Sequence, residues 1–282
     1  ASWSDAYNRA QHGRFTPTLR RGWVTEIVCF TLFFYMPRSL RMVILKDLRG
    51  FVRDAKQWTQ MVIMFGLLVI YALNLQRLPL DIGGAAMRGL IAFLNLTTIS
   101  LILATFTSRF VYPLLSLESQ QLWLVGLLPV KRMQLLVAKF IFAATITGLA
   151  SLGVMALAVN VLDLSPSWAR LHLLICGGVC VGLCGLAVGM GARFPVLGQR
   201  NPARIASGFG GTFNLIASML FVFIEMGGVA LLSLHEVMAG ASGGASLSIR
   251  SYVLGALLIA FGLAIAIASL WLGGRRFARL EV

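Results

Sequence analysis

The residues best suited to catalysis lie in a Gly- and Ser-rich stretch near the end of the chain. Residues 240–244 match the pattern G-x-S-x-G, in which a serine between glycines can act as a nucleophile; here that serine is Ser242. A nucleophilic serine needs a base within hydrogen-bond reach, and the nearest histidine in the sequence is His235. Gly/Ser-rich sequence produces this pattern by chance, and no strand-to-helix elbow surrounds it. An intramembrane serine hydrolase is therefore the least favoured function.

Signals for nucleotide and metal binding are missing from the sequence. No Gly-Lys pair occurs anywhere in the chain, so the backbone-plus-lysine cradle of a phosphate-binding loop cannot form. The histidines, His12, His172 and His235, fall in separate predicted loops, away from cysteines and carboxylates at metal-ligand spacing. We therefore expect no catalytic residue, cofactor or metal in this chain.

The composition indicates an integral membrane protein. Of the 282 residues, 58% are hydrophobic and only 12% are charged, which leaves too little polar surface for a water-soluble globule of this length. Because a spanning helix needs about 20 mostly apolar residues, the hydropathy pattern predicts an all-α protein with about six transmembrane helices. These spans are expected at residues 58–75, 89–110, 137–162, 170–191, 212–234 and 252–273.

The basic residues predict the topology. If both ends of the chain are cytoplasmic, all but four of the 24 Lys and Arg residues lie on the cytoplasmic side. The four exceptions are Arg77, Arg88, Arg170 and Arg250. Positive residues favour the cytoplasmic side of a plasma (inner) membrane, so this asymmetry accounts for the net charge of +14 without nucleic acid as a partner.

A few polar residues fall inside the predicted spans. Glu225 lies near the middle of one, where an ionised carboxylate is costly unless it faces a cavity or finds a partner. A translocation path and a protonated, hydrogen-bonded structural role are equally compatible with that position. Asn95 and Asn214 are weaker path candidates, because such amides more often form hydrogen bonds between helices.

Small residues in the span at 170–191 predict close helix packing. Gly178 and Gly182, and again Gly185 and Gly189, are four residues apart, which lets another backbone approach either within the protomer or across a dimer. Three cysteines at every fourth position of the same span are interpreted as packing residues. They are Cys176, Cys180 and Cys184.

Two segments outside the spans are amphipathic or interrupted. Residues 38–57 place apolar side chains at helical spacing with basic residues mostly elsewhere, which predicts an interfacial helix attracted to anionic headgroups of the bilayer. The apolar run at 23–36 is too short to cross easily and ends at Pro37, so it is a candidate second interfacial helix. Residues 113–135 form a predicted cytoplasmic segment in which Ser116 is available as a helix cap and Pro129 stops a helix. An ordinary interfacial loop and a segment that docks on a partner fit this pattern equally well.

Four stretches of the sequence resemble the permease family known as putative ABC exporters. They are KDLRGFVRDAKQWTQ, FLNLTTISLILATFTSRF, SRFVYPLLSLESQQLWLVGLLPVKRMQLLVAK and RFPVLGQRNPARIASGFGGTFNL. The resemblance covers roughly residues 38–225. It implies the membrane-spanning subunit of an ABC-type exporter, preceded by further membrane sequence, so that this chain is the C-terminal part of a longer protein.

The resemblance also implies partners and residue roles. A separate ATP-binding subunit would supply ATP and Mg and would receive a coupling segment at 113–135, and a second permease half or a homodimer would complete the transporter. The coupling residues would be Leu117, Glu118, Gln121, Trp123, Pro129, Lys131 and Arg132. The interfacial helix would be anchored by Lys46, Asp47, Arg49, Arg53 and Asp54.

We therefore expect an interfacial segment at 1–57 and a six-span permease domain at 58–282. Differential contacts at the coupling segment would let ATP binding in the partner favour one arrangement of the spans. A membrane scaffold that assembles other proteins is the main alternative. The substrate stays open, because the predicted path residues are almost wholly apolar.

Overall fold

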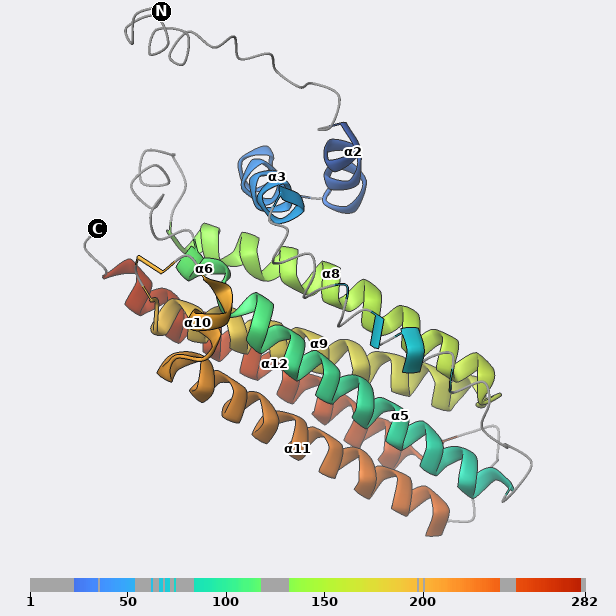
Figure 1. The fold of residues 1–282 in the computed structure, drawn as a ribbon. Helices are drawn as coiled ribbons and strands as arrows, with labels where there is room; N and C mark the ends of the chain where they lie inside the picture. The colour runs from blue at the N-terminus through green and yellow to red at the C-terminus, as the bar shows by residue number, and fades with distance from the viewer. Residues whose placement is uncertain are drawn as a thin grey trace, which may run out of the picture. The chain divides into compact units, whose positions relative to one another are not determined.

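The computed structural model describes most of the chain, and every described secondary-structure element in it is helical (Figure 1). The described residues are 23–34, 36–53, 62, 66, 67, 69–71, 74, 84–117, 132–196, 198, 199, 201–238 and 247–279. The chain divides into two compact units, residues 1–50 and 51–282, and the boundary falls inside a helix.

The first unit contains two helices, α2 (Trp23–Leu32) and α3 (Arg38–Arg53). Pro37 separates them, and its carbonyl accepts the first helical hydrogen bond of α3 from the Arg41 amide at 3.1 Å. Val43, Ile44 and Leu45 of α3 are buried, whereas Lys46 and Gly50 are exposed. The helix predicted at 38–57 is thus confirmed over 38–53, and its position at a membrane surface stays a prediction.

The second unit is a bundle of long helices (Figure 1). Helix α5 (Gly84–Phe106) continues into the π-turn η1 (Thr107–Val111) and the short α6 (Leu114–Leu117). The remaining elements are α8 (Arg132–Val161), α9 (Pro166–Arg193), α10 (Pro202–Ala206), α11 (Phe209–Met238) and α12 (Ile249–Ala278).

Five of the described helices are long and apolar enough to cross a membrane, so the part of the chain that the structure describes is all-α and has the helices of a multi-pass membrane protein. They coincide with five of the six predicted spans, and each is longer than its prediction at one end or at both. The predicted span at 58–75 lies mostly outside the described residues and stays a prediction.

Local sequence sets the helix starts. Pro166 occupies the first turn of α9, where its missing N–H costs nothing, and Pro202 does the same in α10. The Asn201 side chain accepts a hydrogen bond from the Ala203 amide at 3.1 Å and thereby caps α10. At the start of α12 the Ser248 hydroxyl accepts from the Ser251 amide at 3.3 Å.

Helix α9 is the centre of the bundle and packs most closely on α12. A Cβ on Gly178 would lie 3.3 Å from the Ile259 Cα, and one on Gly185 would lie 2.5 Å from the Ala266 Cα. Gly189 faces the Ser269 backbone of the same helix, whereas Gly182 lies between the Phe221 ring of α11 and the Gly262 carbonyl of α12. In this structure the glycine row thus packs against helices of the same chain.

The cysteines lie on another face of α9, towards α8. Cys176, Cys180 and Cys184 are buried free thiols. The Thr147 hydroxyl lies 3.2 Å from the Cys180 Sγ and 3.1 Å from the Cys184 Sγ. This row fills the α8–α9 interface, in agreement with the packing interpretation.

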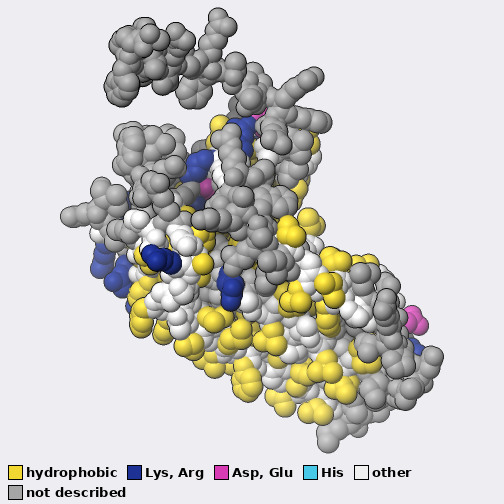
Figure 2. Space-filling view, in the orientation of Figure 1, with side chains coloured by type: hydrophobic (Ala, Val, Ile, Leu, Met, Phe, Trp, Pro, Cys, Tyr) yellow, Lys and Arg dark blue, Asp and Glu magenta, His cyan; other side chains and the backbone are white. Residues whose placement is uncertain are grey.

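The two ends of the bundle differ in charge. One end, here named the basic end, carries Arg109, Arg132, Arg193, Arg204, Arg275, Arg276 and Arg279 at the termini of the described helices. The opposite end carries Arg88, Arg170 and Arg250, and hydrophobic side chains cover the flank seen in Figure 2. Lys139 lies two turns inside α8 and is buried.

Candidate functional site

The predicted coupling segment at 113–135 begins at a distorted helix end. At η1 the helix widens, and the Tyr112 amide donates to the Thr107 carbonyl, five residues back, at 3.0 Å. The Thr107 hydroxyl donates to the Leu103 carbonyl at 2.9 Å. Single π-turns of this kind inside long helices are frequent at functional sites.

Three hydrogen bonds tie this helix end to the elbow that joins α9 to α11. The Tyr112 hydroxyl donates to the Phe194 carbonyl at 3.2 Å, and the Val196 amide donates to the Ser116 Oγ at 3.1 Å. The Asn214 side-chain amide donates to the Ser108 Oγ at 3.0 Å. These hydrogen bonds are named here the root–elbow contact. They join α5 and α6 to α9 and α11, close to Leu117, the last described residue before the gap at 118–131.

Close packing around Tyr112 reinforces the root–elbow contact. Tyr112 is fully buried, and a Cβ on Gly191 would lie 2.6 Å from its carbonyl oxygen. Gly210 faces the Tyr112 ring and hydroxyl so closely that a side chain there would overlap them. The elbow therefore uses glycines to bring two backbones against one tyrosine.

The structure revises the sequence interpretation of this region. Ser116 is not a helix cap, because it lies inside α6 and its hydroxyl accepts from the elbow. The sequence pattern did not single out Tyr112 or Ser108. Tyr112 stands in the SRFVYP stretch before the loop, but its importance depends on Gly191 and Gly210, which are far away in the sequence.

The predicted coupling residues are only partly described. Leu117 is half-buried at the end of α6, and Arg132 is exposed at the start of α8, where its guanidinium donates to the Phe277 carbonyl of α12 at 3.1 Å. The others lie outside the described residues: Glu118, Gln121, Trp123, Pro129 and Lys131. Their docking roles stay predictions.

The Asn214–Ser108 hydrogen bond should be measurable as a coupling energy. Hydrogen bonds between transmembrane helices contribute about 0.6 kcal/mol on average, and up to roughly 1.7 kcal/mol. We expect a double-mutant cycle of Asn214→Ala and Ser108→Ala, read by unfolding in detergent, to give a coupling in that range. Ser100→Ala is the matched control, because the buried Ser100 hydroxyl donates within its own helix to the Leu96 carbonyl. A coupling energy of the same size in the cycle of Asn214→Ala and Ser100→Ala would contradict the Asn214–Ser108 hydrogen bond.

The three predicted path residues are all buried but do not converge on one site. The Asn95 amide faces the Met155 Sδ of α8 at 3.6 Å, whereas Asn214 contacts the end of α5. Glu225 faces α12, where a Cβ on Gly262 would lie 3.5 Å from its Oε1. Each residue thus occupies a different helix interface. The Asn214–Ser108 contact is a hydrogen bond between two helices, which the sequence favoured for Asn214 over a role in the translocation path.

Glu225 is the most unusual polar group of the bundle. Its side chain is 1% exposed, and neither carboxylate oxygen has a hydrogen-bond partner. Phe221, one turn earlier, stacks on Phe261 with ring centroids 5.7 Å apart, so the surroundings are apolar. An unpaired charge in such a place is costly, which favours the neutral acid.

His172 also differs from its sequence-based placement. It lies inside α9 and is 1% exposed, not in a loop, and one ring nitrogen lies 3.0 Å from the Trp168 carbonyl. His235 lies in the last turns of α11, and Ser242 lies outside the described residues. The geometry of the hydrolase alternative is therefore untested.

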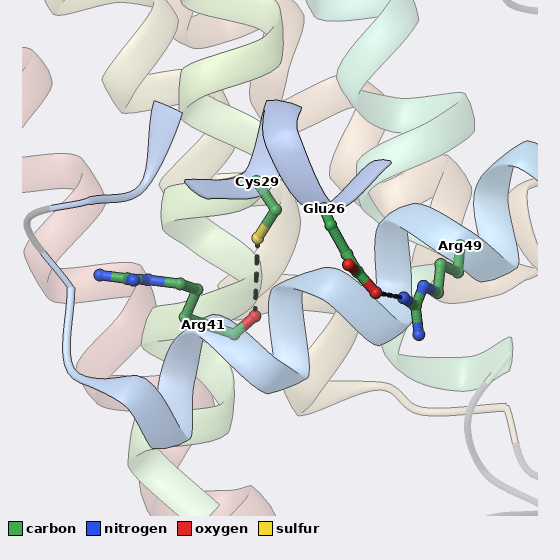
Figure 3. Close-up of polar contacts among 4 residues, drawn as sticks. All are labelled: Glu26, Cys29, Arg41 and Arg49. Carbon is green, nitrogen blue, oxygen red and sulfur yellow. Dashed lines mark hydrogen bonds and ion pairs between the residues drawn. The ribbon is translucent and has the colours of Figure 1, made fainter. Parts of the chain in front are cut away.

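In the first unit, two polar contacts join α2 and α3 (Figure 3). The Arg49 guanidinium donates to the Glu26 carboxylate, and the Cys29 thiol lies 3.7 Å from the Arg41 carbonyl. Burial raises the pKa of the Cys29 thiol, and the Arg41 and Arg49 charges oppose that shift only in part.

The predicted anchoring residues of the interfacial helix also interact within this unit. The Lys46 ammonium lies 3.8 Å from an Asp47 carboxylate oxygen, and Arg49 pairs with Glu26 across the two helices. The Arg49–Glu26 pair is exposed on both sides, and exposed pairs of this kind contribute little to stability. The Arg53 side chain and the whole of Asp54 lie outside the part of the chain that the structure describes.

Comparison with known proteins assigns the family. A family model described as "Putative ATP-binding cassette" matches residues 2–282, almost the whole chain. The chain belongs to this family. No curated protein and no solved structure matches the chain. Membership in the ATP-binding cassette family and five membrane-length helices together indicate involvement in an ABC transporter.

The family description names ATP binding and not a permease. This chain, however, contains no Gly-Lys pair, which a phosphate-binding loop requires. Its described residues instead form a helical bundle with a root–elbow contact at the basic end. The helical bundle, and not a nucleotide-binding motif, is therefore the feature that indicates the role of this chain in the transporter.

Proposed function

We propose that the chain is the membrane-spanning permease of an ABC-type exporter and that a separate subunit binds and hydrolyses ATP. The observation that carries the proposal is the root–elbow contact. It fixes the start of the predicted coupling segment to α9 and α11, through Phe194, Val196 and Asn214. A force on the predicted coupling segment would therefore act on α5, α9 and α11 together.

The proposed mechanism needs no chemistry in this chain. Closure of two ATP-bound partner subunits would displace residues 113–135, and the root–elbow contact would pass that displacement to α5, α9 and α11. A partner can shift the spans only by contacting one arrangement better than the other. The loop is the proposed place of that differential contact, with access alternating between the two sides of the membrane.

The proposal also sets the orientation and the partners. The basic end would face the cytoplasm of a plasma (inner) membrane, in keeping with the positive-inside bias. A second permease half or a second copy of the chain would complete the transporter. It would have to meet a surface other than the glycine row, because α12 occupies that row.

Glu118→Lys tests the coupling role. We expect the variant to insert and fold like the unchanged protein but to lose most of its transport-linked ATPase activity, because a reversed charge would disturb docking. Glu118→Gln should have a smaller effect. Arg250→Glu, at the opposite end of the bundle, controls for a charge change far from the loop. Unaltered coupling in Glu118→Lys would count against the docking role.

Co-purification of the full-length protein from its native membrane tests the partner directly. A stoichiometric ATP-binding subunit is expected, and deletion of 118–128 should release it. This deletion spares Ser116 and therefore keeps the root–elbow contact. A protein that purifies alone, without nucleotide-linked activity, would favour the membrane scaffold.

A further inference from the structure

Three aromatic rings gather at the basic end, where the elbow meets α11. Phe194 ends α9, and Phe209 and Phe213 lie in the first turns of α11. The centroid of the Phe194 ring lies 6.0 Å from that of Phe209 and 6.1 Å from that of Phe213. Phe209 is 79% exposed and Phe213 is 44% exposed. Exposed apolar rings at the end of a spanning helix are well placed to contact lipid.

Two guanidinium groups from different helices converge on this cluster. The Arg193 Cζ of α9 lies 5.9 Å from the Phe194 ring centroid, and the Arg276 Cζ of α12 lies 5.7 Å from the same centroid. Within the described part of the chain, neither arginine has a carboxylate partner or a side-chain hydrogen bond. Two like charges thus lie beside one ring, and no described carboxylate neutralises either of them.

We propose that Arg193 and Arg276 bind the phosphate of an anionic phospholipid whose acyl chains lie along α11. Guanidinium groups match the geometry of phosphate oxygens and can bind them with paired N–H donors. A bound anion would also relieve the repulsion between the two cations. Binding of this kind does not depend on the proposed transport function.

The apolar surface beside the arginines favours a lipid over a free phosphate ion. From Phe213 the exposed face of α11 continues through Ile216, Leu220 and Phe223 towards the middle of the span. A headgroup on the two arginines would therefore place its chains on a continuous apolar strip. A soluble anion would leave that strip unused.

The test is lipid binding to the purified protein in a neutral detergent. We would titrate phosphatidylglycerol and, separately, phosphatidylcholine, and count the retained lipid by native mass spectrometry. Phosphatidylglycerol should bind preferentially. A basic residue near a membrane surface contributes an attraction worth about a five-fold change in affinity. Arg193→Gln and Arg276→Gln should each weaken phosphatidylglycerol binding by about that factor, and the double variant should lose the preference.

Controls separate this site from general basicity and from misfolding. Arg250→Gln, which removes an exposed arginine from the opposite end, should leave the preference unchanged. The double substitution Arg193→Lys and Arg276→Lys keeps the charge and should retain most of the preference even if the glutamine variants fold poorly. Equal binding of the two lipids to the unchanged protein would overturn the proposal. If inorganic phosphate displaced phosphatidylglycerol at an equal concentration, the two arginines would form a site for a soluble anion, and the lipid proposal would be wrong.

Discussion

Gly189→Ala is expected to destabilise the bundle by about 2 kcal/mol or more, because over-packing a tight interface costs roughly 1–3 kcal/mol. A methyl group at Gly189 would overlap the Ser269 backbone carbonyl of α12, and backbone cannot rotate away as a side chain can. Gly273 of α12 faces Gly189 in the same way, so the two helices would have to separate. Thermal unfolding in detergent, followed by circular dichroism, measures the effect.

Gly177→Ala is the matched control on the same helix. No atom lies within 4 Å of a Cβ at Gly177, and alanine is the better helix former. This variant should unfold at the same temperature as the unchanged protein or slightly higher. If Gly189→Ala and Gly177→Ala unfold alike, α9 and α12 do not pack as closely as the structure shows.

Glu225→Leu is expected to raise the unfolding temperature of the protein and, if the permease proposal holds, to lower its transport-linked ATPase activity. The substitution removes a buried carboxyl group without a hydrogen-bond partner, which costs about 1–3 kcal/mol to bury. Leucine is of similar size and suits the apolar neighbours. For a chain of this length the gain should amount to a few degrees. Opposite changes in stability and activity would indicate a group retained for function.

Glu225→Gln and Ile224→Leu complete the comparison. Glutamine keeps the shape and polarity of the side chain but cannot ionise, so a loss of activity in Glu225→Gln would identify the proton as the required feature. Ile224 is exposed on the other side of α11, and its substitution should change neither quantity. A lower unfolding temperature in Glu225→Leu would instead favour a structural role for the carboxyl group.

Helical spacing and hydropathy predicted most of the second unit. The apolar runs correspond to five described helices, and the amphipathic pattern at 38–57 corresponds to α3. Such patterns are local, since a membrane requires every backbone polar group to be satisfied within its own helix. His172 is a case in point: the predicted span at 170–191 includes it and α9 contains it, whereas its interpretation as a loop residue rested on its polar character alone and is wrong.

The sequence by itself determined the class of the protein, the positions of the long helices and the clustering of basic residues at one end, because length, hydropathy and charge act residue by residue. Only the tertiary structure decided that the glycines of α9 face α12 and that Asn95, Asn214 and Glu225 lie in separate interfaces. It also joined Tyr112 to Phe194 and brought Arg193 and Arg276 to one ring. The physical reason is that a spanning helix can form in any rotation about its axis, and side-chain packing against its neighbours selects one.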